Sequence, residues 1–203
     1  MNTRVLLIRH ATTPKVGKGL TGWLPGVSLD DNGRAQAQKL VKQLEAVPLD
    51  AIYSSPLERT RETAAPLATS RGIEVIENQD LGEIHFGEWQ GKDFPEIEKH
   101  SSWAAFNSYR SNVRAPGGEL MLEAQARMVR GVLAIVQAHQ NQNVAIFSHA
   151  DVIKSFIFHL LGIPLDFHQR VEISPASIST VDFLDEFPVV RNINSQCEPC
   201  LPM

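Results

Sequence analysis

The sequence predicts an α/β fold: a three-layer sandwich with a mostly parallel central sheet, helices on both faces and an antiparallel edge strand. Short apolar runs alternate along the chain with segments whose apolar residues recur at helical spacing. Two strand-like runs at residues 177–183 and 189–193 are joined by a short link, which suits an antiparallel hairpin. The chain shows no internal repeat or linker, so we expect residues 1–203 to form one domain.

The first half of the chain predicts three strands and two helices. The strands are short runs rich in apolar residues, at 5–8, 50–54 and 73–76. A first amphipathic helix is expected over residues 33–47, with Asp30 or Asp31 as its N-cap. A second helix should run to about Arg71, because residues 55–58 have the Ser-x-x-Glu spacing of a capping box with proline at the first helical position.

The second half repeats the alternation after a longer irregular stretch. We expect a helix over residues 119–139, a strand over 143–148 and a helix directly after it that stops near Gly162. The intervening residues, about 84–118, are expected to form a lid segment. The last residues, about 194–203, are expected to be a flexible tail.

Composition excludes several classes of protein. Nineteen basic against 23 acidic residues give a net charge of -4, which argues against a nucleic-acid partner. No apolar run reaches membrane-spanning length and the N-terminus does not resemble a signal peptide, so we expect a cytoplasmic protein without a membrane partner. Cys197 and Cys200 have C-x-x-C spacing, which raises a redox or zinc role as an alternative. A zinc site needs more ligands than this one pair, so we expect no metal.

Basic and imidazole side chains follow three of the predicted strands. Arg9 and His10 follow the first strand, Arg59 lies shortly after the second, and His149 follows the strand at 143–148. If these strands are parallel, all three junctions open on one edge of the sheet. Arg59 would lie in the first turn of a helix, where free backbone amides already favour an anion. Two guanidinium groups suit a tetrahedral dianion, so the junctions predict a phosphate site.

Two histidines beside a phosphate site indicate phosphoryl transfer without a metal. A neutral imidazole can act as the nucleophile and form a phosphohistidine intermediate. The leaving oxygen then needs a proton from a carboxylic acid in a loop at the same edge. Glu83 and Glu88 are the candidates, and position along the chain favours Glu83 only modestly.

The chain resembles the histidine phosphatase superfamily, also called phosphoglycerate mutase-like. The matching motifs span nearly the whole chain and are Arg9-His10-Ala11, similar to the family's Arg-His-Gly signature, residues 54–63, residues 81–91, Pro116-Gly117-Gly118-Glu119 and Ser148-His149-Ala150. The resemblance implies that His10 is the nucleophile and Glu83 the proton donor. It also implies that Arg9, Arg59 and His149 bind phosphate, with no metal or cofactor required. Further candidates for phosphate binding are Thr13, Gly22 and Ala150.

Two departures from the family pattern concern the backbone beside the active-site histidines. The family has glycine after each histidine, whereas this chain has Ala11 and Ala150. Alanine could narrow the phosphate site, or the two positions could simply have ordinary dihedral angles. We expect ordinary dihedral angles.

The reaction is predicted from chain length and the lid. The family core either hydrolyses a phosphate ester or, in a mutase, returns the phosphoryl group to the substrate. Residues 92–115 carry several aromatic side chains, which are typical of core but could cover a substrate. The short chain is similar to the small phosphatases, including those acting on α-ribazole phosphate. We therefore expect a phosphatase for small-molecule phosphate esters and allow for a homodimer; the alternatives are a mutase and a catalytically weak phosphate-binding module.

Overall fold

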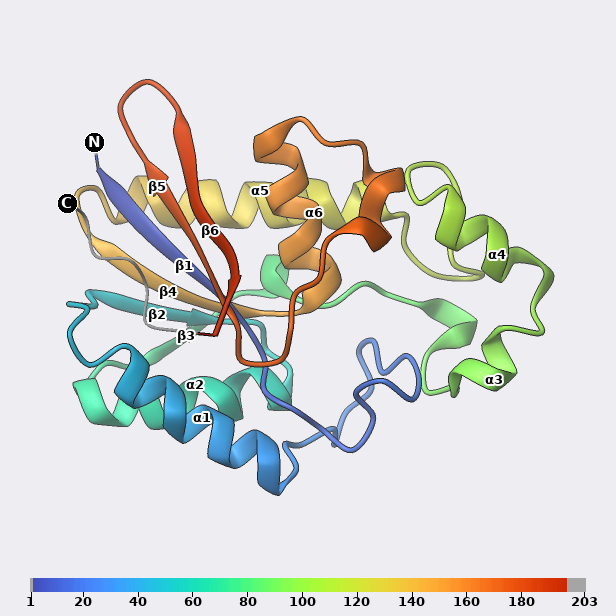
Figure 1. The fold of residues 1–203 in the computed structure, drawn as a ribbon, viewed down its shortest axis with the longest axis horizontal. Helices are drawn as coiled ribbons and strands as arrows, with labels where there is room; N and C mark the ends of the chain where they lie inside the picture. The colour runs from blue at the N-terminus through green and yellow to red at the C-terminus, as the bar shows by residue number, and fades with distance from the viewer. Residues whose placement is uncertain (1, 197–203) are drawn as a thin grey trace.

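A computed structural model describes residues 2–196 (Figure 1). The strands are β1 (Thr3–Arg9), β2 (Ala51–Ser54), β3 (Val75–Glu77), β4 (Asn143–Ser148), β5 (Ile178–Phe183) and β6 (Pro188–Ser195). The α-helices are α1 (Asp31–Gln43), α2 (Glu58–Arg71), α3 (Phe94–Ile97), α4 (Ser101–Ser108), α5 (Met121–Ala138) and α6 (Ala150–Leu161). Short 3-10 helices lie at Gln79–Leu81, Gly87–Trp89 and Leu165–Arg170.

The six strands form one mixed sheet in the order β3-β2-β4-β1-β5-β6. The strands β1, β2, β3 and β4 are parallel, whereas β5 is antiparallel to both β1 and β6. The predicted class is therefore confirmed, including the antiparallel hairpin at one edge. Parallel pairing of β1, β2 and β4 also means that the three polar junctions open on the same edge.

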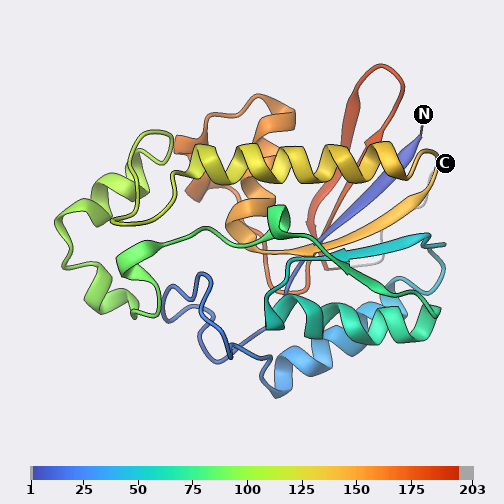
Figure 2. The same ribbon diagram turned by 180° about the vertical axis from the view of Figure 1, so that it is seen from behind.

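Alternate residues of the central strands pack on opposite faces of the sheet. Val5 and Leu7 of β1 join the core formed with α5 and α6, whereas Leu6 and Ile8 face α1 and α2. Figures 1 and 2 show these two pairs of helices on opposite sides of the sheet. A strand buried on both faces needs a continuous apolar run, which explains why residues 5–8 are apolar throughout. Truncating one such leucine to alanine costs about 2–5 kcal/mol of stability.

The helices α1 and α2, which pack on the same face of the sheet, have different N-terminal caps. Asp30 caps α1 as predicted, because its carboxylate accepts a hydrogen bond of 2.7 Å from the Gly33 amide. The predicted capping box of α2 is wrong: the helix begins at Glu58, and no side chain caps it. Tertiary contacts explain the difference, because Ser55 Oγ lies 2.9 Å from His149 Nε2, and the Glu58 carboxylate accepts a hydrogen bond from the Gly26 amide.

Several boundaries differ from the sequence prediction. The helix α1 ends at Gln43 rather than residue 47, although Leu44 and Val47 still pack in the core. The predicted tail starts too early, because β6 continues to Ser195 and the Asn194 side chain accepts a hydrogen bond from the Ser174 amide. Cys197 and Cys200 lie outside the described residues. Among residues 2–196, no helix is long and apolar enough to cross a membrane.

Most of the expected lid segment, residues 84–118, lies beyond the N-terminal end of α5, to one side of the central sheet (Figure 2). It contains α3 and α4, and it meets the loop after β1 through an isolated bridge between Gly19 and Asp93. Its aromatic side chains divide into two groups. Trp89 and Phe106 are buried, with ring centroids 5.1 Å apart, whereas Phe94 and Trp103 line a cavity. Some aromatic side chains of the lid segment therefore belong to the core, as is typical, and others face the cavity, where they could cover a substrate.

Candidate active site

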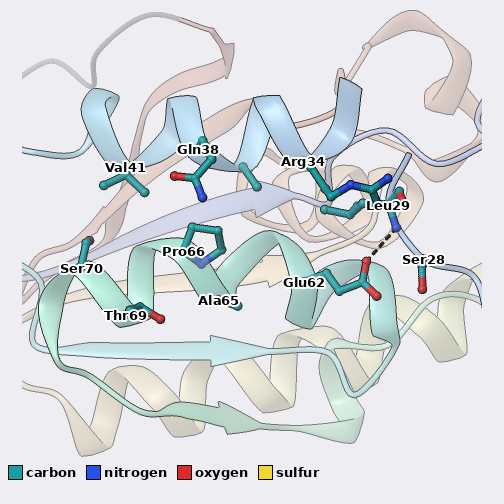
Figure 3. A pocket seen from close by; sticks show the side chains of 11 residues that line it. Ser28, Leu29, Arg34, Gln38, Val41, Glu62, Ala65, Pro66, Thr69 and Ser70 are labelled. Atoms are coloured by element: carbon teal, nitrogen blue, oxygen red, sulfur yellow. Dashed lines mark hydrogen bonds between the residues drawn. The ribbon is translucent and has the colours of Figure 1, made fainter. Parts of the chain in front are cut away.

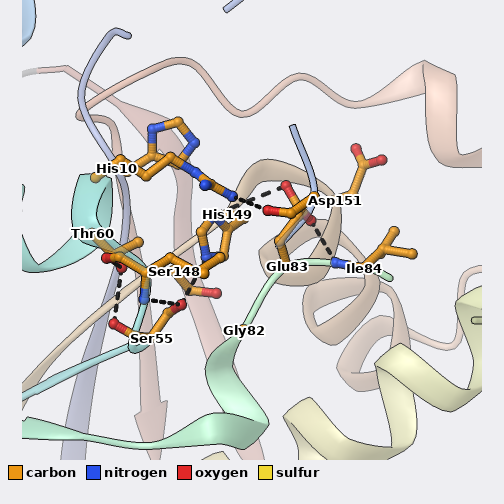
Figure 4. Close-up of polar contacts among 12 residues, drawn as sticks. His10, Ser55, Thr60, Gly82, Glu83, Ile84, Ser148, His149 and Asp151 are labelled. Carbon is orange, nitrogen blue, oxygen red and sulfur yellow. Dashed lines mark hydrogen bonds and ion pairs between the residues drawn. The ribbon is translucent and has the colours of Figure 1, made fainter. Parts of the chain in front are cut away.

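The three polar junctions come together at the carboxyl edge of the parallel strands. Arg9 of β1 pairs with Ser148 of β4, and Ser54 of β2 pairs with Phe147. The His10 amide then donates a hydrogen bond of 2.9 Å to the Ser148 carbonyl. In-register pairing thus aligns the three strand ends, and Figure 4 shows His10, His149 and Ser55 side by side there.

The His10 side chain is held as one neutral tautomer. Its Nδ1 lies 2.7 Å from the Ala11 carbonyl oxygen, which can only accept a hydrogen bond, so Nδ1 carries the proton. Burial, and then the charges of Arg59 and Arg9, hold the pKa of His10 well below its usual value. The ring is therefore neutral at pH 7, and Nε2 has a free lone pair.

Two guanidinium groups, those of the buried Arg59 and the half-buried Arg9, lie beside His10 without a carboxylate partner among residues 2–196. Arg59 is 1% exposed and donates from Nη2 to the Gly22 carbonyl at 2.9 Å, while Arg9 donates to the Ile173 carbonyl at 2.6 Å. Nε and Nη1 of Arg59 and Nε of Arg9 have no hydrogen-bond partner in this described part of the chain. Burying such charges without a counterion is costly, so the pair is suited to an anion.

His149 lies at the N-terminus of α6, completely buried, with its ring centroid 5.3 Å from that of His10. Its Nε2 contacts Ser55 Oγ, and its Nδ1 is 3.9 Å from Glu83 Oε2 (Figure 4). Burial, and then Arg59, lower the pKa of His149 well below its usual value. Both histidines are therefore neutral while the positive charge of the site comes from arginine.

Glu83 is held in the site by both its side chain and its backbone. Its Oε1 accepts a hydrogen bond of 2.9 Å from the Ile84 amide, and its carbonyl accepts one of 2.8 Å from Arg127. Burial, and then the charge of Asp151, raise the pKa of Glu83 to about 7. A carboxyl group with this pKa can donate a proton and recover it at neutral pH. The other candidate, Glu88, is exposed and is not among the residues that line the cavity described below.

A cavity of about 320 Å³ joins this edge of the sheet to the lid segment. Of the predicted site residues, the cavity is lined by Arg9, His10, Thr13, Glu83 and Ala150. Gly22 instead contacts Arg59 through its carbonyl, with a φ of 51° that favours glycine. Arg59 and His149 are not among the lining residues, although the His149 ring centroid is 5.3 Å from that of His10 and both residues are buried. The structure therefore gathers most of the predicted residues at one cavity and ties Gly22 to it through Arg59, and their roles in phosphate binding stay a prediction.

The alanines that replace the family's glycines cause no backbone strain. Neither Ala11 nor Ala150 is among the described non-glycine residues with positive φ. Ala11 is fully buried, and its amide donates a hydrogen bond of 2.9 Å to Thr63 Oγ1. The expectation of ordinary dihedral angles is confirmed.

A hollow larger than the active-site cavity lies elsewhere in the described chain. It measures about 770 Å³ and runs between α1 and α2, where Glu62 accepts a hydrogen bond from the Leu29 amide (Figure 3). Its lining contains no histidine, and it is separate from the three strand ends. Size therefore does not identify the reactive site in this fold.

Two charged residues of the cavity, Asp151 and Arg110, were not among the predicted site residues, although Arg110 lies in the expected lid segment. Asp151 directly follows the Ser148-His149-Ala150 motif, so its place in the first turn of α6 was a usable signal. Arg110 lies just after α4, and nothing local indicates that it bonds to Asp151. Within residues 2–196, no three His, Cys, Asp or Glu side chains are grouped as metal ligands, and the expectation of a metal-free enzyme stays a prediction.

The fold and this site define an α/β protein with a phosphate-type anion site built on two histidines. Residues 5–196 match the model of the histidine phosphatase superfamily (branch 1), and the chain belongs to this family. It is 31% identical to phosphoserine phosphatase 1 of Hydrogenobacter thermophilus, over 96% of this chain and 93% of that protein. It is 27% identical to adenosylcobalamin/alpha-ribazole phosphatase of Escherichia coli, over 95% and 96%. The solved structure of Bacillus stearothermophilus YhfR superposes with a TM-score of 0.89 at 30% identity, covering 97% and 98%.

Proposed function

We propose that this protein is a phosphatase that hydrolyses small phosphate monoesters through a phosphohistidine on His10. One observation carries the proposal: a neutral His10 with a free Nε2 lies beside the buried Arg59 and the half-buried Arg9, which have no carboxylate partner among residues 2–196. The arginines neutralise the phosphate dianion, and the lone pair is available to attack phosphorus.

In the first step, His10 Nε2 forms a bond to phosphorus and the bond from phosphorus to the ester oxygen breaks. The leaving oxygen keeps the electron pair and takes the proton of Glu83, so the alcohol departs neutral. Arg9, Arg59 and His149 hold the three peripheral phosphate oxygens during the transfer. Thr13 and Ala150 line the same cavity and are proposed to contact the substrate.

In the second step, a water molecule attacks phosphorus while the Glu83 carboxylate accepts its proton. The bond between phosphorus and Nε2 breaks, its electron pair returns to His10, and inorganic phosphate leaves. Both starting groups are thereby restored. A pKa of about 7 suits Glu83 to both roles.

Hydrolysis is favoured over a mutase reaction by the relatives. Two proteins named as phosphatases align with nearly the whole chain. A cavity of about 320 Å³ lies at the small end of the range for ligand sites, which supports a small ester as the substrate. The cytoplasmic location and the homodimer stay predictions.

The test measures hydrolysis of p-nitrophenyl phosphate by the wild type and by the His10→Ala variant. We expect the loss of the nucleophile to reduce kcat by about 10³-fold or more. His159→Ala is the matched control, because His159 is an exposed residue of α6 outside the cavity, and it should keep full activity.

A second readout distinguishes the alternatives. Brief incubation of the wild type with labelled substrate should leave an acid-labile phosphoryl group on His10. Binding of phosphate without turnover would identify a phosphate-binding module instead, and faster isomerisation than hydrolysis of 3-phosphoglycerate in the presence of bisphosphoglycerate would identify a mutase.

A further inference from the structure

The segment that ends at Glu83 is held by one mostly buried arginine of α5, Arg127. The Arg127 side chain is 13% exposed, and its Nη1 donates hydrogen bonds to the carbonyl oxygens of Asp80 at 3.0 Å and Gly82 at 2.7 Å. Its Nη2 donates to the Glu83 carbonyl at 2.8 Å. One guanidinium therefore binds three backbone carbonyls of residues 80–83, next to the proposed proton donor.

The Arg127 guanidinium has no donor left for a ligand. Its Nε donates to Glu119 Oε1 at 2.8 Å and its Nη2 donates to Oε2 at 3.0 Å, and the Glu119 side chain is 11% exposed. A guanidinium has five N–H donors, and these bonds together with those to the carbonyls use all of them. Arg9 and Arg59, by contrast, each have an Nε without a partner among residues 2–196. Arg127 is therefore suited to fix the backbone and not to bind an anion.

Two further side chains hold the same segment. Ser148, the last residue of β4, donates from Oγ to the Leu81 carbonyl at 2.7 Å. Trp23, in the loop between β1 and α1, donates from Nε1 to the Glu83 carbonyl. Its ring lies so close to Gly82 that a Cβ there would overlap with it. The backbone that carries the Glu83 side chain is thus fixed by α5, by β4 and by this loop.

We propose that Arg127 is a positioning residue for proton transfer, which acts through the backbone of residues 80–83 and keeps the Glu83 carboxyl group at the leaving oxygen. The inference rests on the proposed phosphatase function. Arg127 is not among the residues that line the cavity, so its effect is transmitted through Glu83 and not through the substrate. A misplacement of about 1 Å can cost about 10²-fold in rate, so loss of the Arg127 bonds should weaken the step that needs Glu83.

The test compares an alkyl ester, whose alkoxide needs a proton to leave, with p-nitrophenyl phosphate, whose phenolate does not. The alkyl ester is the better substrate of glycerol 3-phosphate and phosphoserine. Arg127→Met removes the donors at similar side-chain length and should lower kcat/KM for the alkyl ester by about 10–100-fold, but that for p-nitrophenyl phosphate by less than about threefold. A merely structural role would lower both values equally, because a smaller folded fraction affects both substrates alike.

A double variant tests whether Arg127 acts through Glu83. When it is added to Glu83→Gln, Arg127→Met should change kcat/KM for the alkyl ester by less than about threefold, because the proton donor is already absent. Independent contributions would instead multiply the two losses, and that result would overturn the proposal.

Arg130→Met is the matched control, because Arg130 lies on the same helix and contacts the same segment from the surface. It is 66% exposed and pairs with the Asp80 carboxylate at 2.6 Å. The ratio of the two kcat/KM values should stay within about twofold of the wild-type ratio. A shift in Arg130→Met as large as that in Arg127→Met would overturn the positioning role.

Arg127→Lys keeps the charge but has fewer donors, so it should shift the ratio in the same direction by a smaller amount, about threefold or more. This variant decides the question if Arg127→Met does not fold, and an unchanged ratio in the Arg127 variants would overturn the inference. Hydrolysis of p-nitrophenyl phosphate alone by the wild type would also overturn it, because no proton transfer would then need positioning. Failure of the wild type to hydrolyse any of the three esters would instead overturn the proposed function.

Discussion

The two ends of the cavity differ in how their cations are held. At the sheet edge, Arg9 and Arg59 donate to backbone carbonyls and have no carboxylate partner in the described chain. At the lid, Arg110 and Lys15 are paired with Asp151 and Asp93. An unpaired buried cation keeps its full charge for a dianion that enters the site. The charge of a paired cation is already partly neutralised by its carboxylate partner. From this difference we expect the phosphate group to bind at the sheet edge and the variable part of the substrate to lie toward the lid.

The same contrast appears in the supporting structure. The sheet-edge residues follow strands whose ladders are paired in register on both sides. The lid contributes no strand to this sheet and is held by buried side chains such as Trp89 and Phe106 and by single backbone contacts such as the bridge between Gly19 and Asp93. Changes at the sheet edge should therefore abolish chemistry, and changes in the lid should alter substrate preference.

Removing Arg59 should cause the largest loss among the residues that bind rather than react. Arg59→Ala should lower kcat/KM by about 10²–10³-fold for every monoester, because the phosphate loses a desolvated charge-assisted partner. Steady-state kinetics on an aryl and an alkyl phosphate measure this loss. Arg61→Ala, two residues further along α2 and exposed beside Glu77, should stay within about twofold. A loss limited to one substrate would contradict the division between the two ends.

Changing Glu83 should separate the two chemical steps. Glu83→Gln should reduce alkyl phosphate hydrolysis by about 10²–10⁴-fold, because the alcohol cannot leave with a proton. p-Nitrophenol departs without one, so this substrate should give a burst equal to the enzyme concentration, followed by slow turnover of the phosphohistidine. Rapid mixing measures the burst. Glu88→Gln should behave like the wild type, and equal activity losses in the two variants would contradict the role of Glu83.

The pH dependence follows from the same carboxyl group. Burial and Asp151 raise the pKa of Glu83 to about 7, so its acidic form is lost as pH rises through that value. We expect kcat/KM for alkyl phosphates to fall about tenfold per pH unit above pH 7. His10 is already neutral there, because its pKa is lowered, and adds no opposing rise. A flat profile from pH 7 to 9 would contradict this assignment.

The lid should give smaller, substrate-dependent effects. Trp103→Ala removes one aromatic wall of the cavity and should raise KM by about three- to tenfold for esters with apolar groups, with kcat nearly unchanged. Tyr109→Ala is the control, because Tyr109 is exposed just after α4 and is not among the cavity-lining residues. A fall in kcat as large as that of Arg59→Ala would show that the two ends are not separable.

The smallest effect on activity is expected at Ala11. Ala11→Gly should keep kcat within about twofold, because the backbone angle there is already ordinary. Stability should fall by about 1 kcal/mol, because glycine gains freedom in the unfolded chain and a buried methyl group is lost. Urea unfolding measures the change. A large gain in activity would show that alanine narrows the phosphate site.

Local sequence patterns determined the fold class and which polar residues share one edge of the sheet. A continuous apolar run predicts a strand buried on both faces, and residues directly after such runs lie at the carboxyl edge of a parallel sheet, so position places Arg9, His10 and His149 together. Their roles come from the family resemblance and stay a prediction. The prediction was wrong for the capping box of α2, because Ser55 and Glu58 have partners far away in the chain.

Tertiary structure alone decided the electrostatics of the site. The resemblance implies Glu83 rather than Glu88, but the burial that distinguishes them and the charge of Asp151 from α6, which together raise the pKa of Glu83, exist only in the folded chain. The tautomer of His10 depends on one carbonyl oxygen, and the contact of Arg110 with Asp151 joins positions 41 residues apart. Sequence patterns show which groups share an edge, but charge and proton position depend on distances and solvent exposure, which arise only when the chain has folded.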